Sequence, residues 1–311
     1  MIKVLTFPKK KVKTIAQTIS STTAVLVLII FLTEATTGVI SVWAANLIGT
    51  SGPDALEGTD KDDNILGRGG NDIISDGFRS DEVFGGSGDD TIEVEGTQDP
   101  SDPNGDNTEE DGQDVVDGER GDDNIDARGS VGSMLIHGGS NDYIIAVGGE
   151  VESNGRIYGD SGNDEINGGG DGTFNVWDGS GDDELNGSSE CVINCAYGGS
   201  GNDRIISPND FASGGSGNDF IEFADCTEVA YGDSGNDELR AGELSTELHG
   251  GSGSDKVVGA SEDDLLFGDG NSDTLTGNEG ADSFSCGSGR DTITDFSAAE
   301  GDTKTADCEN F

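Results

Sequence analysis

The sequence predicts an all-β protein, a right-handed parallel β-roll or β-solenoid built from coils of about 18 residues with glycine-rich turns. Three observations predict this fold. An aspartate recurs every nine residues near both ends of the repeat region, the residue two places after each aspartate is apolar, and a glycine-rich stretch precedes it. Short strand-like segments alternate with these glycine turns, and no helical period is visible beyond residue 44.

The repeat unit is stated most fully by GGSGDDTIE at Gly85–Glu93, in which the first glycine is position one, the aspartate position six and the isoleucine position eight. Position six is occupied by Asp54, Asp63, Asp72, Asp81, Asp90, Asp114, Asp123, Asp142, Asp164, Asp183, Asp203, Asp219, Asp237, Asp255, Asp264, Asp273, Asp282 and Asp291. Position eight is apolar in every one of these units, which a disordered glycine-rich and aspartate-rich linker would not maintain. We therefore favour a folded repeat array, in which each unit buries its position-eight side chain against a neighbour.

The chain begins with a segment that differs from the repeats. Five lysines lie within the first thirteen residues, nine apolar residues follow at Ala24–Leu32, and Val42-Trp43-Ala44 has small residues suited to cleavage. This order predicts a secretory signal peptide over residues 1–44. The alternative is an uncleaved membrane anchor over about residues 23–45, although its strictly apolar run is short for a span of about 20 residues.

The repeats predict one β-roll over residues 45–296, followed by a C-terminal cap or tail over residues 297–311. An acidic loop insertion at about residues 96–113 interrupts the roll, because it holds Pro100 and Pro103 and lacks apolar periodicity. Between Asp123 and Asp255 the position-six aspartates are 16 to 22 residues apart, which is close to two nine-residue repeats. After Asp255 the strict nine-residue spacing returns.

This spacing predicts how the aspartates stack. Residues about 18 apart lie on the same edge of neighbouring coils, so the aspartates from Asp123 to Asp255 and on through Asp273 and Asp291 form one column. Asp63, Asp81, Asp264 and Asp282 belong to the opposite edge. The roll is therefore expected to bind metal along one side throughout and along both sides only near its ends.

Composition narrows the class of partner. The chain has 63 acidic against 16 basic residues, a net charge of −47, and only 32% hydrophobic residues. Such a chain resists compaction unless cations neutralise it. Nucleic acid is excluded as a partner, because phosphate binding needs clustered lysine and arginine.

The cysteines fit an exported protein, in which disulfides persist. None of the CxxC metal spacings occurs, so a thiolate zinc site is not expected. Short loops are the easiest to close, which predicts Cys191–Cys195 and Cys286–Cys308 pairs with Cys226 left over. Other pairings remain open at this point.

The nonapeptide Gly-Gly-x-Gly-x-Asp-x-apolar-x resembles the calcium-binding repeat of the RTX, or hemolysin-type, family, and Gly198–Ile206, Gly214–Glu222 and Gly250–Val258 match every specified position. The resemblance implies that turns of successive coils enclose Ca²⁺ with the aspartate carboxylate and backbone carbonyls. The turns of Asp81, Asp114, Asp142 and Asp264 depart from the glycine pattern. The ligands that it implies are Asp54, Asp63, Asp72, Asp90, Asp123, Asp164, Asp183, Asp203, Asp219, Asp237, Asp255, Asp273, Asp282 and Asp291.

Calcium also fits on physical grounds. It takes about six to eight oxygen ligands in flexible geometry, whereas Mg²⁺ demands a tighter octahedron. Ligands from neighbouring coils meet only in the folded chain, so binding free energy becomes folding free energy.

These features predict a secreted, non-enzymatic calcium-binding repeat protein with a structural or adhesive role at the cell surface or in the extracellular matrix. Its expected partners are calcium ions and cell-surface or matrix components, and a membrane only if the N-terminal segment stays uncleaved. Two alternatives are open: a polysaccharide-acting enzyme built on the solenoid face, and a calcium-storage or mineral-binding protein.

Overall fold

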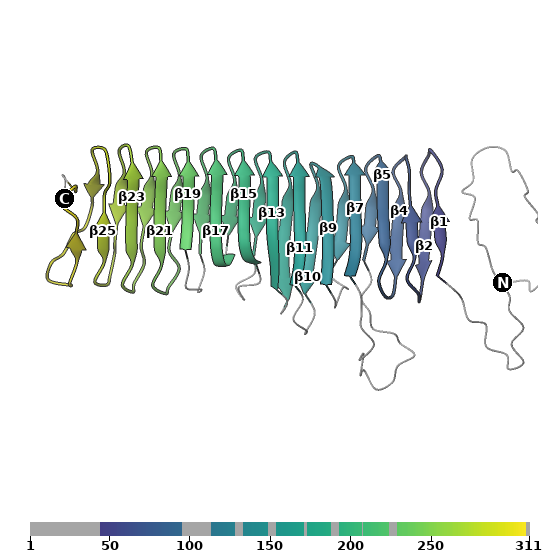
Figure 1. The fold of residues 1–311 in the computed structure, drawn as a ribbon, viewed down its shortest axis with the longest axis horizontal. Helices are drawn as coiled ribbons and strands as arrows, with labels where there is room; N and C mark the ends of the chain where they lie inside the picture. Colours follow the sequence, from purple (N-terminus) through teal and green to yellow (C-terminus); the bar gives the residue numbers. More distant parts are fainter. Residues whose placement is uncertain are drawn as a thin grey trace, which may run out of the picture.

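The computed structural model describes residues 44–94, 113–127, 133–148, 154–170, 173–187, 193–206, 208–223 and 229–308. Within these ranges the chain is a parallel β-solenoid, in which successive coils lie side by side from the N-terminal to the C-terminal end (Figure 1). No helix occurs in the described ranges, and so none there could span a membrane. The predicted signal peptide, apart from Ala44, and nearly all of the predicted acidic insertion lie outside them.

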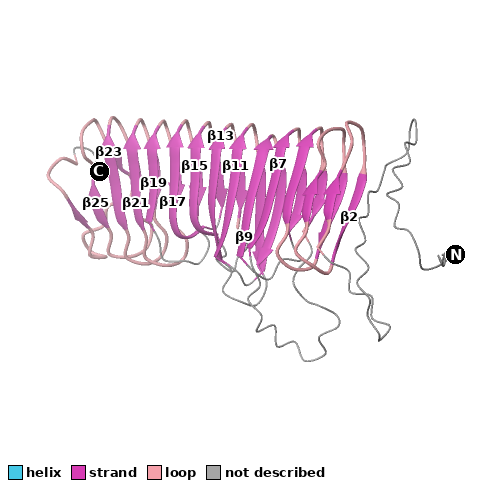
Figure 2. Cartoon of the chain, turned by 45° about the vertical axis from the view of Figure 1, so that its right-hand side comes forward, coloured by secondary structure: helices cyan, strands magenta, loops and turns pink. Residues whose placement is uncertain are grey.

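Two sheets form the long faces of the solenoid, and each coil contributes one strand to each sheet (Figure 2). The 14-stranded sheet contains β1 (Asn46–Ile48), β3 (Asn64–Leu66), β5 (Glu82–Ser87), β7 (Gln113–Arg120), β9 (Ser133–Ser140), β11 (Asn154–Ser161), β13 (Thr173–Ser180), β15 (Ile193–Ser200), β17 (Pro208–Ser216), β19 (Val229–Ser234), β21 (Glu247–Ser252), β23 (Leu265–Gly270), β25 (Ser283–Ser285) and β27 (Thr303–Lys304). The 13-stranded sheet contains β2 (Ala55–Thr59), β4 (Ile73–Gly77), β6 (Thr91–Glu93), β8 (Asn124–Ala127), β10 (Tyr143–Gly148), β12 (Glu165–Gly170), β14 (Glu184–Asn186), β16 (Arg204–Ile206), β18 (Phe220–Glu222), β20 (Glu238–Arg240), β22 (Lys256–Val258), β24 (Thr274–Thr276) and β26 (Thr292–Ile293).

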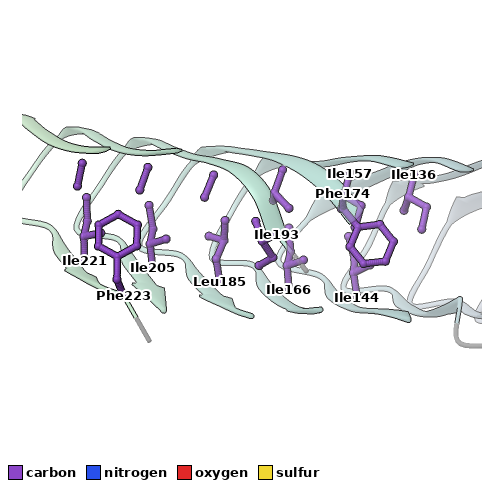
Figure 3. Close-up of a cluster of buried hydrophobic side chains, with 14 of the residues drawn as sticks. Ile136, Ile144, Ile157, Ile166, Phe174, Leu185, Ile193, Ile205, Ile221 and Phe223 are labelled. Carbon is purple, nitrogen blue, oxygen red and sulfur yellow. The ribbon is translucent and has the colours of Figure 1, made fainter. Parts of the chain in front are cut away.

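The apolar residue at position eight fixes which way each strand faces. Side chains alternate between the two faces of a strand, so an apolar residue flanked by polar ones points between the sheets. Ile166, Leu185, Ile205 and Ile221 form one such row inside the solenoid (Figure 3), and each is fully buried. The prediction that position eight is buried is confirmed in every unit.

The register of the 13-stranded sheet survives the variable coil length. Ile125 pairs with Ile144, Ile144 with Ile166 and Ile166 with Leu185, although these steps span 19 to 22 residues. The internal ranges left undescribed all lie between a strand of this sheet and the next strand of the 14-stranded sheet. The large changes in coil length therefore fall on one edge, whereas the turn on the other edge is nearly uniform and is one residue shorter before Asp142.

A row of aromatic rings covers the outer face of the 14-stranded sheet. Neighbouring rings along it have centroids 4.2 to 5.8 Å apart. We call this row the aromatic stack, and it consists of His137, Tyr158, Trp177, Tyr197, Phe211, Tyr231, His249 and Phe267. It spans coils β9 to β23, where the sequence is least regular, and adds cross-strand contacts there.

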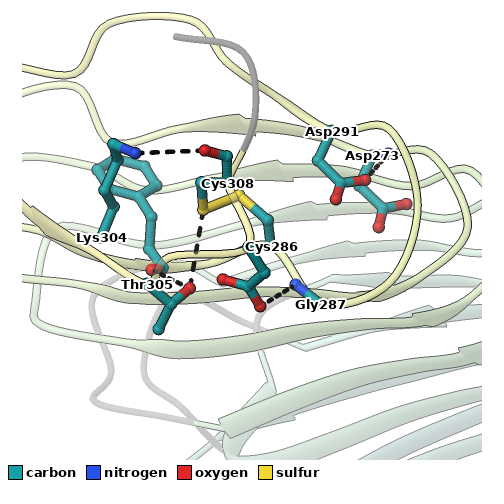
Figure 4. Close-up of a disulfide and its surroundings, with 9 residues drawn as sticks. Asp273, Cys286, Gly287, Asp291, Lys304, Thr305 and Cys308 are labelled. Carbon is teal, nitrogen blue, oxygen red and sulfur yellow. Dashed lines mark hydrogen bonds between the residues drawn. A yellow bond between two sulfur atoms is a disulfide. The ribbon is translucent and has the colours of Figure 1, made fainter.

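The C-terminal end is closed by a disulfide between Cys286 and Cys308, as predicted (Figure 4). Strand β27 lies within the predicted cap and pairs with β25, which continues the sheet by one short strand. The predicted Cys191–Cys195 disulfide is wrong, because Cys195 is present as a thiol. Cys195 lies in β15 where the register with β13 and β17 shifts, and loop length alone ignores this geometry. Cys191 and Cys226 lie outside the described residues.

Candidate metal centres

The turns that lead from the 14-stranded sheet to the 13-stranded sheet carry one unbroken line of position-six aspartates. The backbone N–H of each aspartate donates a hydrogen bond to Oδ1 of the next aspartate along the solenoid, at 2.6 to 3.1 Å. We call this line the main column, and it consists of Asp54, Asp72, Asp90, Asp123, Asp142, Asp164, Asp183, Asp203, Asp219, Asp237, Asp255, Asp273 and Asp291. It confirms the single column predicted from the spacing and extends it to the N-terminal coils.

The opposite edge carries two short columns, one near each end. Asp63 donates its backbone N–H to Asp81, and Asp81 donates to Asp114. Near the C-terminus, Asp264 donates in the same way to Asp282. This is the arrangement that the sequence predicted for the opposite edge.

The second carboxylate oxygen, Oδ2, has a different environment. In most of these aspartates it is buried and has no hydrogen-bond partner among the described residues. A buried carboxylate without compensation is strongly disfavoured, so each such oxygen requires a cation or a proton. The aspartates concerned are Asp72, Asp81, Asp90, Asp123, Asp142, Asp164, Asp183, Asp203, Asp219, Asp237, Asp255, Asp273 and Asp282.

Position one forms the rest of the cradle. A Cβ built on Gly198 would lie 2.5 Å from Asp203 Oδ2 and 2.7 Å from the carbonyl oxygen of Gly214 in the next coil. A Cβ on Gly268 would likewise lie 2.7 Å from Asp273 Oδ2. Glycine is therefore required here, because a carboxylate oxygen and a carbonyl oxygen from adjacent coils converge on its Cα. An all-oxygen cradle of this kind fits Ca²⁺.

Burial and mutual repulsion raise the pKa values of many of the column carboxyls. Loss of hydration is the largest cause, and neighbouring aspartates raise the pKa further. The pKa of Asp81 rises to about 8, those of Asp123 and Asp203 to about 7, and that of Asp164 to about 6. Without a cation, Asp81 therefore favours the protonated carboxyl at neutral pH, and the carboxyls with pKa values of about 7 are partly protonated.

A family model for the RTX calcium-binding nonapeptide repeat matches residues 48–77, 66–99, 110–130, 152–172, 196–207, 209–223, 249–284 and 258–293. The chain belongs to this RTX family. It is thus a calcium-binding repeat protein with a β-solenoid fold. A search of curated proteins finds no match to this RTX chain.

The structure places all fourteen predicted ligands in the columns, Asp63 and Asp282 in the short ones and the others in the main column. It also places four aspartates there that were left out of the predicted set: Asp81, Asp114, Asp142 and Asp264. Asp142 shows why the glycine criterion was too strict. Gly138 supplies the crowded position beside its Oδ2, even though the preceding turn is shortened.

Sequence reasoning missed two functional candidates, Asp76 and Asp178. Both are fully buried, and both occupy position one, where Gly159 and Gly198 stand in the coils flanking Asp178. Burial raises the pKa of Asp178 to about 10, and repulsion by Asp183 adds to the shift. The sequence feature that could have identified both residues is an Asp-Gly pair at the start of the turn in place of Gly-Gly.

Proposed function

We propose that this chain is a secreted calcium-binding protein whose β-roll folds when calcium binds, and that it serves a structural or adhesive role at the cell surface or in the matrix. The observation that carries the proposal is the main column, with its succession of buried Oδ2 atoms that lack hydrogen-bond partners. Such a column is stable as carboxylates only when cations lie between the coils.

The chain's own groups have distinct roles in this proposal. The Oδ1 atoms of the main column align adjacent coils through backbone N–H donors, as from Asp183 to Asp203. The Oδ2 atoms and position-one carbonyls, such as Asp203 Oδ2 and the Gly214 carbonyl, would hold the ion. Calcium, when bound, supplies the positive charge that offsets the repulsion between coils. Because these ligands come from different coils, they converge only when the coils are stacked.

The extracellular setting is supported by two features. The first 44 residues have the order of a secretory signal, and the C-terminal disulfide favours an oxidising compartment. Extracellular calcium modules bind with dissociation constants of about 10⁻⁴ to 10⁻³ M. Amino-terminal sequencing of the chain recovered from culture medium should give a start after Ala44, and recovery only from membranes with an intact N-terminus would contradict secretion.

Calcium titration of the purified chain tests the folding proposal. Far-ultraviolet circular dichroism should show little β-structure in excess chelator and a cooperative gain as Ca²⁺ is added, with a much smaller response to Mg²⁺. The same β content with and without chelator would contradict folding on calcium. Retention on isolated cell-surface or matrix polysaccharide, without cleavage of it, would support the non-enzymatic adhesive role.

A calcium-storage or mineral-binding role is the second candidate, and the net charge of −47 favours it. The two functions differ in stoichiometry. A β-roll fills the gaps between its columns and then saturates, whereas a storage protein also binds ions on its exposed carboxylates. Equilibrium dialysis with calcium in excess distinguishes them, because continued uptake far beyond the number of coils would support storage.

A further inference from the structure

Asp178 is an exception in the interior of the solenoid. It ends the buried part of β13, at the position that glycine holds in the flanking coils, and its side chain is 0% exposed. Neither oxygen of its carboxylate has a hydrogen-bond partner among the described residues. Asp178 thus places a carboxyl group where the flanking coils have a glycine and no side chain.

The carboxyl of Asp178 points at two members of the main column. One carboxylate oxygen from each of Asp164, Asp178 and Asp183 lies within 4.8 Å of the others. A Cβ built on Gly159 would collide with Asp178 Oδ1 and would lie 2.6 Å from Asp164 Oδ2. The Asp178 carboxyl therefore fills the cradle between two adjacent coils, and the glycine of the preceding coil makes room for it.

Among the described residues, no basic group and no hydrogen-bond donor offsets the charge of the Asp178 carboxylate. The charged groups that act on it are Asp183, Asp164 and Asp203, all of which are acidic. Three buried carboxylates converging without a basic partner are strongly destabilising unless a cation joins them. Three carboxylates around one ion also carry more negative charge than a glycine turn, in which a carboxylate oxygen faces a backbone carbonyl oxygen. Affinity for Ca²⁺ rises with ligand charge.

We propose that Asp164, Asp178 and Asp183 together hold one divalent cation in a three-carboxylate site that binds Ca²⁺ more tightly than the surrounding glycine turns. The ligand that makes this site is outside the nonapeptide pattern, in which position one is glycine. The inference rests on the proposed function, because it assumes that the neighbouring turns bind calcium.

A second copy of the arrangement supports the assignment. Asp76 is also fully buried at position one, and its carboxyl lies within 4.8 Å of carboxylate oxygens of Asp81 and Asp114. Asp81 and Asp114 are 33 residues apart in sequence, and the backbone N–H of Asp81 donates to Asp114 Oδ1 at 3.1 Å. A cation at this site would join two coils across the longest step between neighbouring coils in the described solenoid.

Calcium binding at low ion concentration tests the proposal, with Ca²⁺ itself as the probe in equilibrium dialysis of the intact chain. Asp178→Gly restores the glycine of the repeat, and Asp178→Asn keeps the shape while removing the charge. The wild type should bind two Ca²⁺ ions more tightly than the rest. The single variants Asp178→Gly and Asp178→Asn should each bind one ion tightly, and the double variant Asp76→Gly/Asp178→Gly should bind none tightly. The lost ion should bind roughly ten-fold or more weakly in the variants.

Asp160→Gly is the matched control. Asp160 belongs to the turn that ends at Asp164, its side chain is 45% exposed, and its φ of 73° suits glycine. The change removes the same charge and also restores a repeat glycine, so both tight ions should remain. Terbium(III) luminescence, excited through the adjacent Trp177, gives a second readout, and its substoichiometric signal should fall in Asp178→Gly but not in Asp160→Gly.

Two outcomes would overturn the inference. If Asp178→Asn binds Ca²⁺ with the wild-type number and affinity of tight ions, Asp178 is a protonated interior group and no ligand. If Asp178→Gly and Asp160→Gly lose affinity equally, only net charge matters. In both cases the remaining turns still bind calcium, so the proposed function stands. Absence of calcium binding by the wild-type chain would instead contradict the proposed function itself.

Discussion

At the scale of single residues, the position-six aspartate performs two tasks with its two oxygens. Asp203 shows both, since its Oδ1 accepts the backbone N–H of Asp183 at 3.1 Å while its Oδ2 is buried without a hydrogen-bond partner in the described chain. The first oxygen aligns adjacent coils, and the second lies in the oxygen-lined cradle beside Gly198. Glycine at position one makes the second task possible, because a side chain there would collide with Oδ2.

Replacing Asp203 by Asn tests this division of tasks. The amide keeps an oxygen for the backbone hydrogen bond but removes the negative charge that a calcium ion needs. We expect the variant to bind at least one calcium ion fewer and to need more calcium for half-maximal folding, as measured by calorimetry and circular dichroism.

Asp182→Asn is the control for that variant. Asp182 lies at position five, points outward and accepts hydrogen bonds from Asn202, and asparagine occupies the same position in neighbouring turns. Its calcium binding should match the wild type. Equal losses in Asp203→Asn and Asp182→Asn would show that the position-six carboxylate is no more important than any acidic residue of the turn.

At the scale of elements, burial of the position-eight side chains is not the only contact that joins neighbouring strands in the irregular middle coils. Tyr158 and Trp177 stack with centroids 5.1 Å apart on the outer face of paired strands β11 and β13. Phe211 joins the stack between Tyr197 and Tyr231, although Ser213 is the residue in register with both. The stack therefore compensates where the turn motif appears only once per coil.

A double-mutant cycle on Tyr158→Ala and Trp177→Ala measures that contribution. In saturating calcium, the coupling between the two rings should stabilise the fold by about 0.5 to 1.5 kcal/mol beyond the area they bury. Urea unfolding monitored by circular dichroism gives the four free energies. Ile73→Ala is the control, because Ile73 is 64% exposed and should change the free energy of unfolding by about 0.5 kcal/mol or less. A coupling energy of zero would show that stacking between the two rings does not stabilise the fold.

At the scale of the whole molecule, the solenoid is a stack in which each coil contacts its neighbours, so stability depends on many similar interfaces. The net charge of −47 opposes every one of these interfaces unless it is neutralised. Calcium and protons are the two means of neutralisation, and they compete for the same carboxylates.

This competition predicts an unusual pH dependence in chelator. The folded-state pKa values are raised, to about 6 for Asp72, about 7 for Asp237 and about 8 for Asp81. A raised folded-state pKa contributes stability that is present below the unfolded value near 4 and is lost as pH rises through about 6 to 8. The calcium-free chain should therefore gain β-structure on acidification from pH 8 to pH 5.

Circular dichroism across pH with and without calcium checks this expectation. With saturating calcium the folded signal should persist at pH 8, and the calcium concentration needed for folding should fall as pH falls, because protons already neutralise part of the columns. A calcium-free chain that is less structured at pH 5 than at pH 8 would contradict the raised pKa values of the columns.

The sequence by itself determined the repeat, the parallel solenoid and the columns. It could do so because a nine-residue period fixes which residues stack, whatever the detailed conformation, as the alignment of Asp255, Asp273 and Asp291 shows. Cys286 and Cys308 were also predictable, because they lie close together at the chain's end.

Only the tertiary structure decided which side chains meet where the repeat is irregular. The convergence of Asp178 on Asp164 and Asp183 depends on the direction of a position-one side chain, which the turn conformation sets. The place of Phe211 in the aromatic stack and the thiol of Cys195 depend on the register shifts around β15. The physical reason is common to all three: a period specifies which coils are neighbours, whereas contacts between their side chains depend on backbone geometry that varies from coil to coil.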